Sequence, residues 1–258
     1  MISVNSIRTY MECPRKLYNQ KKYPEMEENN LELKYKKDLV FDIQDHIHRN
    51  VRNLDHMMNL DEIIAVLKVD DEYFIEKYVN NLDLTTAEKH NLRAFALNYS
   101  DFFVRSLAIR VEKFLEIAPI DGNTLLERIS TTSLYNYFMK DNNLEICGTC
   151  DKIEIVEGKY HPVKLNFNLP PVSGNWDGDC IELVANALLV EEEFSTEVFV
   201  GFIDYVNIGE RRPVVMDSKL RKGLFKLLIG VKNILHEDFE PEINERLNCV
   251  NCEFHGKC

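Results

Sequence analysis

The sequence lacks the features that would place it among membrane, secreted or fibrous proteins. No stretch approaches the roughly 20 apolar residues that a membrane span needs, and the first 16 residues have helically spaced apolar positions in place of the continuous apolar core of a secretion signal. Glycine and proline number only 10 and 8 among 258 residues, too few for a fibrous or disordered chain. A packed cytoplasmic protein without a membrane partner is therefore expected.

Positive charge is also scarce, with 31 Lys and Arg against 43 Asp and Glu and a net charge of −12. Affinity for nucleic acid comes from Lys and Arg that displace counterions from phosphates, so the surface as a whole does not favour DNA. The net charge does not exclude a local basic groove that binds DNA. The candidate DNA contacts of such a groove are Arg15, Lys16, Arg211, Arg212, Arg221 and Lys222. The alternative is that these basic runs are solvated helix faces.

Apolar spacing predicts helices over residues 3–20, with Pro14 starting a new helix, and over 31–54, 60–69 and 72–81. A capping box at Thr85 and Glu88 opens a further helix. Alternation over 125–130 and 145–168 predicts strands, with a turn at Glu157-Gly158, followed by a helix over 177–193, two β-rich runs, and a helix that begins at Asp217 or Ser218 and ends near 235. The fold class is therefore α/β with a mixed sheet. One domain over 1–258 is expected, with a helical lobe near 25–120 inserted before a core at 121–235.

Seven cysteines in a reducing compartment point to metal binding or simple packing more than to disulfides. Three of them, Cys249, Cys252 and Cys258, lie within ten residues, and a Cys-Pro at Cys13 supplies a fourth thiol. Four thiolates suit either a zinc ion or an iron-sulphur cluster.

A rival site would pair Cys147 and Cys150 with Cys249 and Cys252. It is less favourable because Cys147 and Cys150 run into a predicted strand, where residues three apart point to opposite faces. We expect Cys147, Cys150 and Cys180 to be small packing residues.

Five segments, SIRTYMECPRKLY, GTCD with HPVKLN, WDGDCIELVANALLVEE, VGFIDYVNIGERRPVVMDSKLRKGL and CVNCEFHGKC, occur here in one order. Together they resemble the CRISPR-associated RecB-like exonuclease family of the PD-(D/E)XK nuclease superfamily. The resemblance implies a restriction-endonuclease-like core and a 4Fe-4S cluster held by Cys13, Cys249, Cys252 and Cys258, which would join the two ends of the chain. It also implies that single-stranded DNA ends and the integrase proteins of CRISPR adaptation are partners.

The same resemblance assigns a Mg²⁺ or Mn²⁺ centre, but most of its positions have changed. Asp151 matches the family's Asp, and His48 matches its helical His, with His46 as a second choice. The Glu-x-Lys position contains Lys164 and Asn166, and the Gln-x3-Tyr position contains Glu182 and Asn186. A nearby Glu157-Gly-Lys159 imitates the Glu-x-Lys motif but is expected to be a hairpin turn.

A lysine at a metal-ligand position should oppose metal binding, because two like unit charges about 4 Å apart repel by roughly 4 kcal/mol at an effective dielectric constant of 20. We hypothesise that Lys164 lies near Asp151, and also near Glu182, as an ion pair in the space of the lost metal. Asn166 cannot handle a proton as lysine can. Weakened or lost exonuclease activity is therefore expected. Two alternatives remain: an active exonuclease whose ligands have moved to Asp179 or Glu182, and a zinc-stabilised interaction module.

Overall fold

The computed structural model describes residues 1–26, 31–243, 249 and 252–257. It separates into two compact units, one formed by Met1–Asn29 with Thr132–Cys258 and the other by Asn30–Thr131. The sequence placed the boundaries of the helical lobe near 25 and 120. Among the described residues, no helix is both long and apolar enough to cross a membrane.

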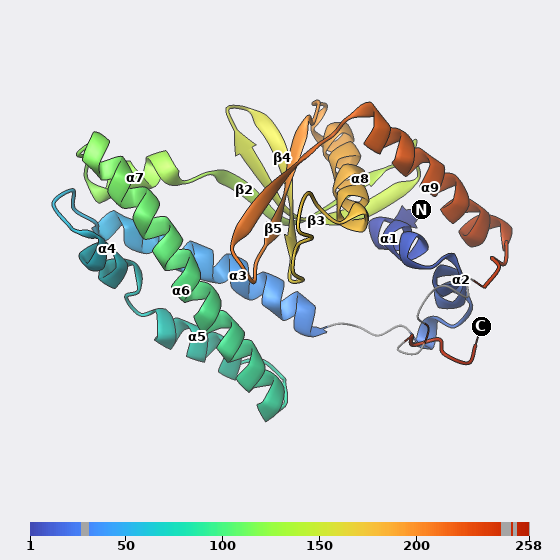
Figure 1. The fold of residues 1–258 in the computed structure, drawn as a ribbon, viewed down its shortest axis with the longest axis horizontal. Helices are drawn as coiled ribbons and strands as arrows, with labels where there is room; N and C mark the ends of the chain where they lie inside the picture. Colours follow the sequence, from blue (N-terminus) through green and yellow to red (C-terminus); the bar gives the residue numbers. More distant parts are fainter. Residues whose placement is uncertain (27–30, 244–248, 250–251, 258) are drawn as a thin grey trace. The chain divides into compact units, whose positions relative to one another are not determined.

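The first unit is built on a mixed sheet, which confirms the predicted α/β class (Figure 1). Its strands are β1 (Ile2–Ser3), β2 (Thr132–Asp141), β3 (Ile146–Val156), β4 (Lys159–Asn166), β5 (Val200–Tyr205) and β6 (Glu210–Val215). They run in the order β1-β3-β4-β5-β6, and β2 also pairs with β3. The β1–β3 and β4–β5 pairs are parallel, and the other pairs are antiparallel.

The hairpin between β3 and β4 turns at Glu157 and Gly158, as the sequence predicted. Both residues have positive φ, 51° and 74°, which a two-residue turn that matches the twist of its strands requires. The literal Glu157-Gly-Lys159 therefore lies at the turn and cannot replace the Glu-x-Lys position on β4.

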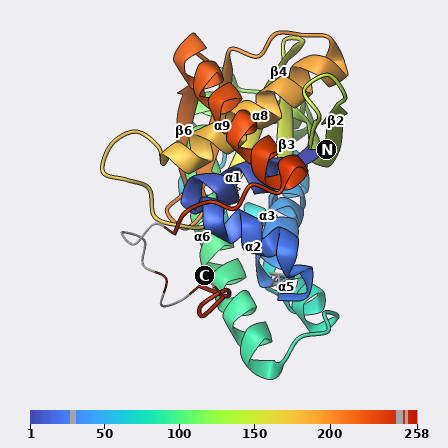
Figure 2. The same ribbon diagram turned by 90° about the vertical axis from the view of Figure 1, so that its right-hand side faces the viewer.

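Helices of the first unit are α1 (Val4–Glu12), α2 (Pro14–Lys22), α8 (Asp177–Phe194) and α9 (Ser218–Glu237), with a short 3₁₀ turn at Pro24–Met26. Helix α8 packs against β2, β3, β4 and β5, and α1 and α9 pack in turn against α8 (Figure 2). The residues that α8 buries, such as Leu183 and Ala187, meet Ile153 and Ile203 of the sheet in one core. This packing holds the first turns of α8 beside the end of β4.

The second unit is helical, with α3 (Leu31–Asn50), a 3₁₀ turn at Val51–Asn53, α4 (Leu60–Leu67), α5 (Asp71–Asn80), α6 (Thr86–Ile117) and α7 (Gly122–Ile129). The predicted capping box is confirmed: Thr85 and Glu88 exchange side chain to backbone hydrogen bonds at the start of α6. Helices α3, α4 and α5 all pack on α6.

The strand predicted over 125–130 is wrong, since these residues belong to α7 and its C-terminal cap. Asp121 caps this helix by accepting a hydrogen bond from the amide of Thr124, and Leu125 is its buried anchor. A Cβ at Gly122 would lie 2.5 Å from the carbonyl oxygens of Val51 and Arg52, so only glycine permits this approach. Six residues of alternation were too short to distinguish a strand from a helix.

Candidate functional site

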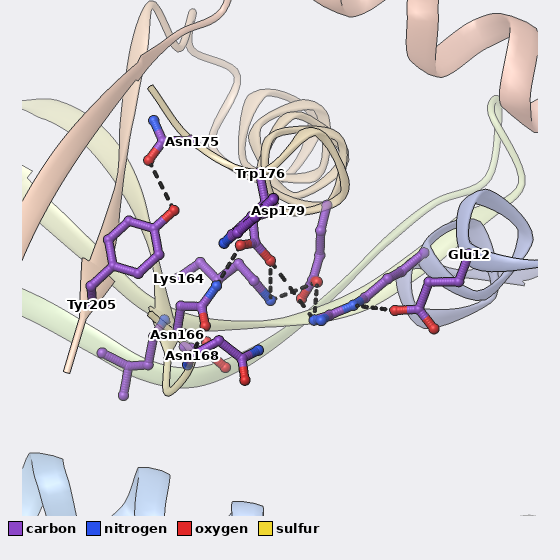
Figure 3. A network of polar contacts seen from close by, with 12 residues as sticks. Glu12, Lys164, Asn166, Asn168, Asn175, Trp176, Asp179 and Tyr205 are labelled. Atoms are coloured by element: carbon purple, nitrogen blue, oxygen red, sulfur yellow. Dashed lines mark hydrogen bonds and ion pairs between the residues drawn. The ribbon is translucent and has the colours of Figure 1, made fainter. Parts of the chain in front are cut away.

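The positions at which the resemblance expects nuclease residues converge where β4 ends and α8 begins (Figure 3). Lys164 and Asn166 are two residues apart on β4, so their side chains share one face of the strand. Asp179 and Glu182 are three residues apart in the first turns of α8, so they share one face of the helix. The contact between α8 and β4 brings these two faces together.

The ammonium group of Lys164 lies between two carboxylates of α8. Its Nζ is 2.6 Å from Oε2 of Glu182 and 4.0 Å from Oδ1 of Asp179. The side chains of Lys164, Asp179 and Glu182 are only 5%, 4% and 11% exposed. A buried charge is tolerated where it is paired, and Lys164 balances one of the two carboxylates.

Arg8 of α1 adds a second cation that the sequence did not predict. Its Nη1 is 3.1 Å from Oε2 of Glu182 and 3.9 Å from Oδ1 of Asp179, and its Nε donates to Glu12 at 3.2 Å. Burial disfavours its charge, yet Glu182 and Asp179 together raise the pKa of Arg8 above its ordinary value. In the sequence, the i, i+4 spacing of Arg8 and Glu12 indicates that both lie on one face of a helix. It does not indicate that Arg8 contacts Glu182.

Asn166 forms hydrogen bonds with Asp179 and with the backbone of Asn168 in this site. Its Nδ2 donates to Oδ2 of Asp179, and its Oδ1 accepts from the amide of Asn168 at 2.7 Å. Burial raises the pKa of Asp179, although Lys164 and Arg8 oppose that rise. An amide at this position orients a carboxylate but exchanges no proton.

Asp151, the residue that matches the family's Asp, is buried where β3 and β4 separate. Strand pairing ends at Lys152 and Val163, and Oδ2 of Asp151 then accepts a hydrogen bond from the amide of Leu165 at 2.9 Å. Lys164 forms ion pairs with Glu182, as the hypothesis allowed, and with Asp179. The role of Asp151 in catalysis stays a prediction.

Asn186 lies one helical turn beyond Glu182 on α8 and is 3% exposed. Its Oδ1 is buried with no hydrogen-bond partner among the described residues. A buried amide oxygen without a hydrogen bond lowers the stability of the fold. Packing alone therefore does not explain why this position holds an asparagine.

The described part of the site does not fit a divalent cation. Nowhere in residues 1–26, 31–243, 249 and 252–257 do three His, Cys, Asp or Glu side chains come together as a metal site. The carboxylates of Asp179 and Glu182 are instead bridged by Lys164. His48 lies on α3 in the other unit, with its ring 5.6 Å from that of Phe103 in an edge-on contact, and its assignment stays a prediction.

Cys13, Cys249 and Cys252 do not come together as a metal site among the described residues, although other contacts link the two ends of the chain. Cys13 caps α2, and its sulphur accepts a hydrogen bond from the amide of Lys16 at 3.4 Å. Lys16 in turn pairs with Glu253 at 3.3 Å, next to Cys252. The amide of Cys252 donates to the carbonyl of Cys249 at 3.2 Å.

Phe254 anchors this tail, since it is completely buried. The ammonium of Lys257 lies 5.5 Å from the ring centre of Tyr23, just beyond α2. Cys258 lies outside the described residues. The described tail residues thus contact Lys16 of α2 and Tyr23, and the cluster assignment stays a prediction.

The rival site with Cys147 and Cys150 is not favoured by the packing. Cys150 is completely buried in the core, its sulphur faces the carbonyls of Lys152 and Val163, and burial raises the pKa of its thiol to about 12. Burial also raises the pKa of the Cys180 thiol to about 11. Both residues behave as packing groups, as expected.

Most of the proposed DNA contacts are engaged within the chain. Arg15 pairs with Glu240 at 2.5 Å, Arg211 with Glu154 and Asp204, and Arg221 with Glu191 at 2.7 Å. Lys16 and Arg212 pair with Glu253 and Glu210. Lys222 is exposed on α9. Five of these six basic residues therefore form ion pairs within the chain. The role of all six in DNA binding stays a prediction.

No family model matches the chain. Part of it is similar to a curated CRISPR protein. The CRISPR-associated exonuclease Cas4/endonuclease Cas1 fusion of Leptospira interrogans is 23% identical over an alignment of 147 residues that covers 53% of this chain. The match covers 27% of that relative, so most of the fusion protein has no counterpart in the similarity.

Proposed function

We propose that this chain is a CRISPR-associated, Cas4-like nuclease-fold protein that handles DNA ends during spacer adaptation, with weakened or lost exonuclease activity. The similarity to a Cas4/Cas1 fusion supports the CRISPR context and the integrase as a partner. The observation that carries the proposal is the 2.6 Å pair between Lys164 and Glu182. An internal ammonium occupies the space between carboxylates where a metal-dependent nuclease would hold its cation.

The proposal is tested with anaerobically purified protein and fluorescein-labelled single-stranded DNA in Mn²⁺. We expect binding of the DNA end without cleavage above background. Robust Mn²⁺-dependent cleavage that Asp151→Ala abolishes would contradict it and would favour an enzyme whose ligands moved to Asp179 or Glu182.

A gain of function provides the complementary test. The double variant Lys164→Glu with Asn166→Lys restores the family's residues at both positions, and we expect it to gain Mn²⁺-dependent cleavage. Lys226→Gln on the exposed side of α9 is the matched control, because it lowers the net charge by one, as the double variant does, far along the sequence from the site.

We further propose that Cys13, Cys249, Cys252 and Cys258 hold a 4Fe-4S cluster. The contacts of Lys16 and Tyr23 with the tail support a shared site at the start of α2. A bound cluster would supply a rigid crosslink between the ends. Brown protein with absorption near 400 nm is expected; a colourless preparation that contains zinc would instead favour the zinc-stabilised module.

A further inference from the structure

The segment 167–176, which joins β4 to α8, presents apolar side chains to solvent. Leu169 is 68% exposed, Trp176 is 50% exposed and Val172 is fully exposed. Exposed apolar residues scattered singly are ordinary, but three within eight residues of one connection form a patch. This patch leads directly into the site, because Asn166 precedes the segment and Asp179 follows it.

This segment has a defined conformation. Arg212 donates to the carbonyls of Pro171 and Gly174, and Asn175 donates to the carbonyl of Pro213 at 3.2 Å. The buried Tyr205 donates its hydroxyl to Asn175 at 3.2 Å. An apolar surface that is already ordered pays little conformational entropy when it binds.

Trp176 is itself fixed by this network. Its Nε1 donates to the carbonyl of Leu169 at 3.0 Å, so the indole is fixed to the backbone of this residue. Both residues line a pocket of about 310 Å³, whose other walls are Arg8, Glu12, Asn168, Gly178 and Asp179. The pocket therefore lies against the ion pairs of the altered nuclease site.

Charge indicates what can approach this surface. The chain carries a net charge of −12, yet residues 167–176 contain no charged side chain. A DNA end can therefore reach this segment without meeting an acid within it, and the flat face of a terminal base matches an exposed indole. Inside the pocket Arg8 is already paired with Glu12 and Glu182, so a phosphate would find its positive charge neutralised.

We propose that segment 167–176 is a stacking platform for the terminal nucleobase of a DNA end, with Trp176 as the stacking residue and Leu169 and Val172 as its apolar rim. This inference rests on the proposed function in DNA-end handling. It adds a contact that only a DNA end can make. A base inside a duplex is stacked on both faces by its neighbours, whereas a terminal base has one face free to stack on Trp176. The platform would hold a frayed end beside Lys164 and Glu182 without reading its sequence.

Trp176 is the single tryptophan of the chain, so its fluorescence reports on this platform alone. The full protein is titrated with a duplex that has a short single-stranded tail, with the same duplex bearing abasic terminal nucleotides, and with a closed dumbbell that has no ends. We expect saturable quenching by the tailed duplex and little change with the other two. A deoxynucleoside monophosphate as a fourth probe shows whether a base suffices without the DNA strand.

Fluorescence anisotropy of labelled tailed DNA provides the second measurement. Trp176→Ala is expected to weaken binding about tenfold, in keeping with the loss of one base-stacking contact. The matched control is Phe225→Ala on α9, an aromatic residue 42% exposed, which should leave binding unchanged.

The outcomes separate this inference from the function on which it rests. DNA binding that is insensitive to Trp176→Ala, or quenching by the dumbbell equal to that by the tailed duplex, overturns the platform alone. Either of these results would indicate that the exposed apolar patch binds a protein partner instead of DNA. Absence of any DNA binding by anisotropy overturns the proposed function and the platform together.

Discussion

At the scale of single residues, Lys164 has the largest consequence for this protein. A lysine on the core-facing side of a strand is ordinarily unfavourable, because burial of an unpaired ammonium is costly. Here Glu182 and Asp179 supply the compensating charge, and Arg8 balances the second carboxylate. The ion pair thus replaces whatever stabilisation a bound cation would provide to two neighbouring acids.

Removal of this one charge should destabilise the first unit. We expect Lys164→Met to lower the free energy of unfolding by about 3 kcal/mol, since Glu182 would keep only Arg8 and Asp179 would lose a neighbour. Urea unfolding measures the loss. Lys226→Met on the exposed side of α9 is the control and should change stability by less than about 0.5 kcal/mol.

A double variant checks the cause. Lys164→Met with Glu182→Leu removes both members of the pair, so it should be less destabilised than Lys164→Met alone. Equal stability of Lys164→Met and the surface control would show that the buried pair is not what holds this site together.

At the scale of elements, the start of α5 contains a second buried acid with a different environment. Asp71 is 4% exposed, accepts a hydrogen bond from the hydroxyl of Ser100, and leaves Oδ1 without a partner among the described residues. Burial raises the pKa of Asp71 above its ordinary value of 3.8, although Ser100 and His46 oppose the rise. The junction of α5 and α6 therefore buries a carboxylate that is poorly compensated.

The raised pKa predicts how pH affects the helical unit. The folded state holds the proton of Asp71 more tightly than the unfolded chain, so stability falls as pH rises from about 3.8 through the raised pKa. Asp71→Asn should remove this dependence and stabilise the protein by about 1 kcal/mol at neutral pH. Thermal unfolding across pH 4–7 measures both effects; a variant that is less stable at pH 7 would contradict the explanation.

At the scale of the whole molecule, the two ends of the chain belong to one unit. The N-terminal residues enter the sheet through β1 and pack through α1 and α2, and the described tail residues contact α2. Closure of a loop of more than 200 residues by a crosslink restricts the unfolded chain strongly. A cluster at these ends would therefore contribute to stability as well as to the position of the tail.

This arrangement predicts a common effect of cysteine substitutions at opposite ends. Cys13→Ser and Cys252→Ser should each lose bound iron and lower Tm by about 10 °C, the shift for a loss of roughly 3 to 4 kcal/mol. Iron analysis and thermal unfolding under anaerobic conditions measure the two effects. Cys180→Ser should keep its iron, and an equal loss there would mean that the iron is not held at the ends.

Local features of the fold were predictable from neighbouring residues alone. The start of α2 at Pro14, the capping box of α6 and the turn at Glu157-Gly158 each depend on interactions within a few residues. Strand β2 was not predicted, because most of its residues are exposed or only partly buried and show no clean alternation. The strand predicted over 125–130 failed because the structure of a short segment is decided by what it packs against. Gly122 shows this directly, since a side chain there would meet the carbonyl oxygens of Val51 and Arg52, which lie about 70 residues earlier in the sequence.

The sequence by itself determined that Lys164 and Asn166 stand where the resemblance to the RecB-like exonucleases expects a Glu and a Lys, because side-chain identity is read from the chain directly. It also determined which thiols lie at the two ends. Only the tertiary structure decided that Arg8, Asp179 and Glu182 meet Lys164, since a charge buried between a strand and two helices finds its partners through packing. Side-chain identity is a local property, whereas the pairing of buried charges depends on residues that are up to 174 positions apart.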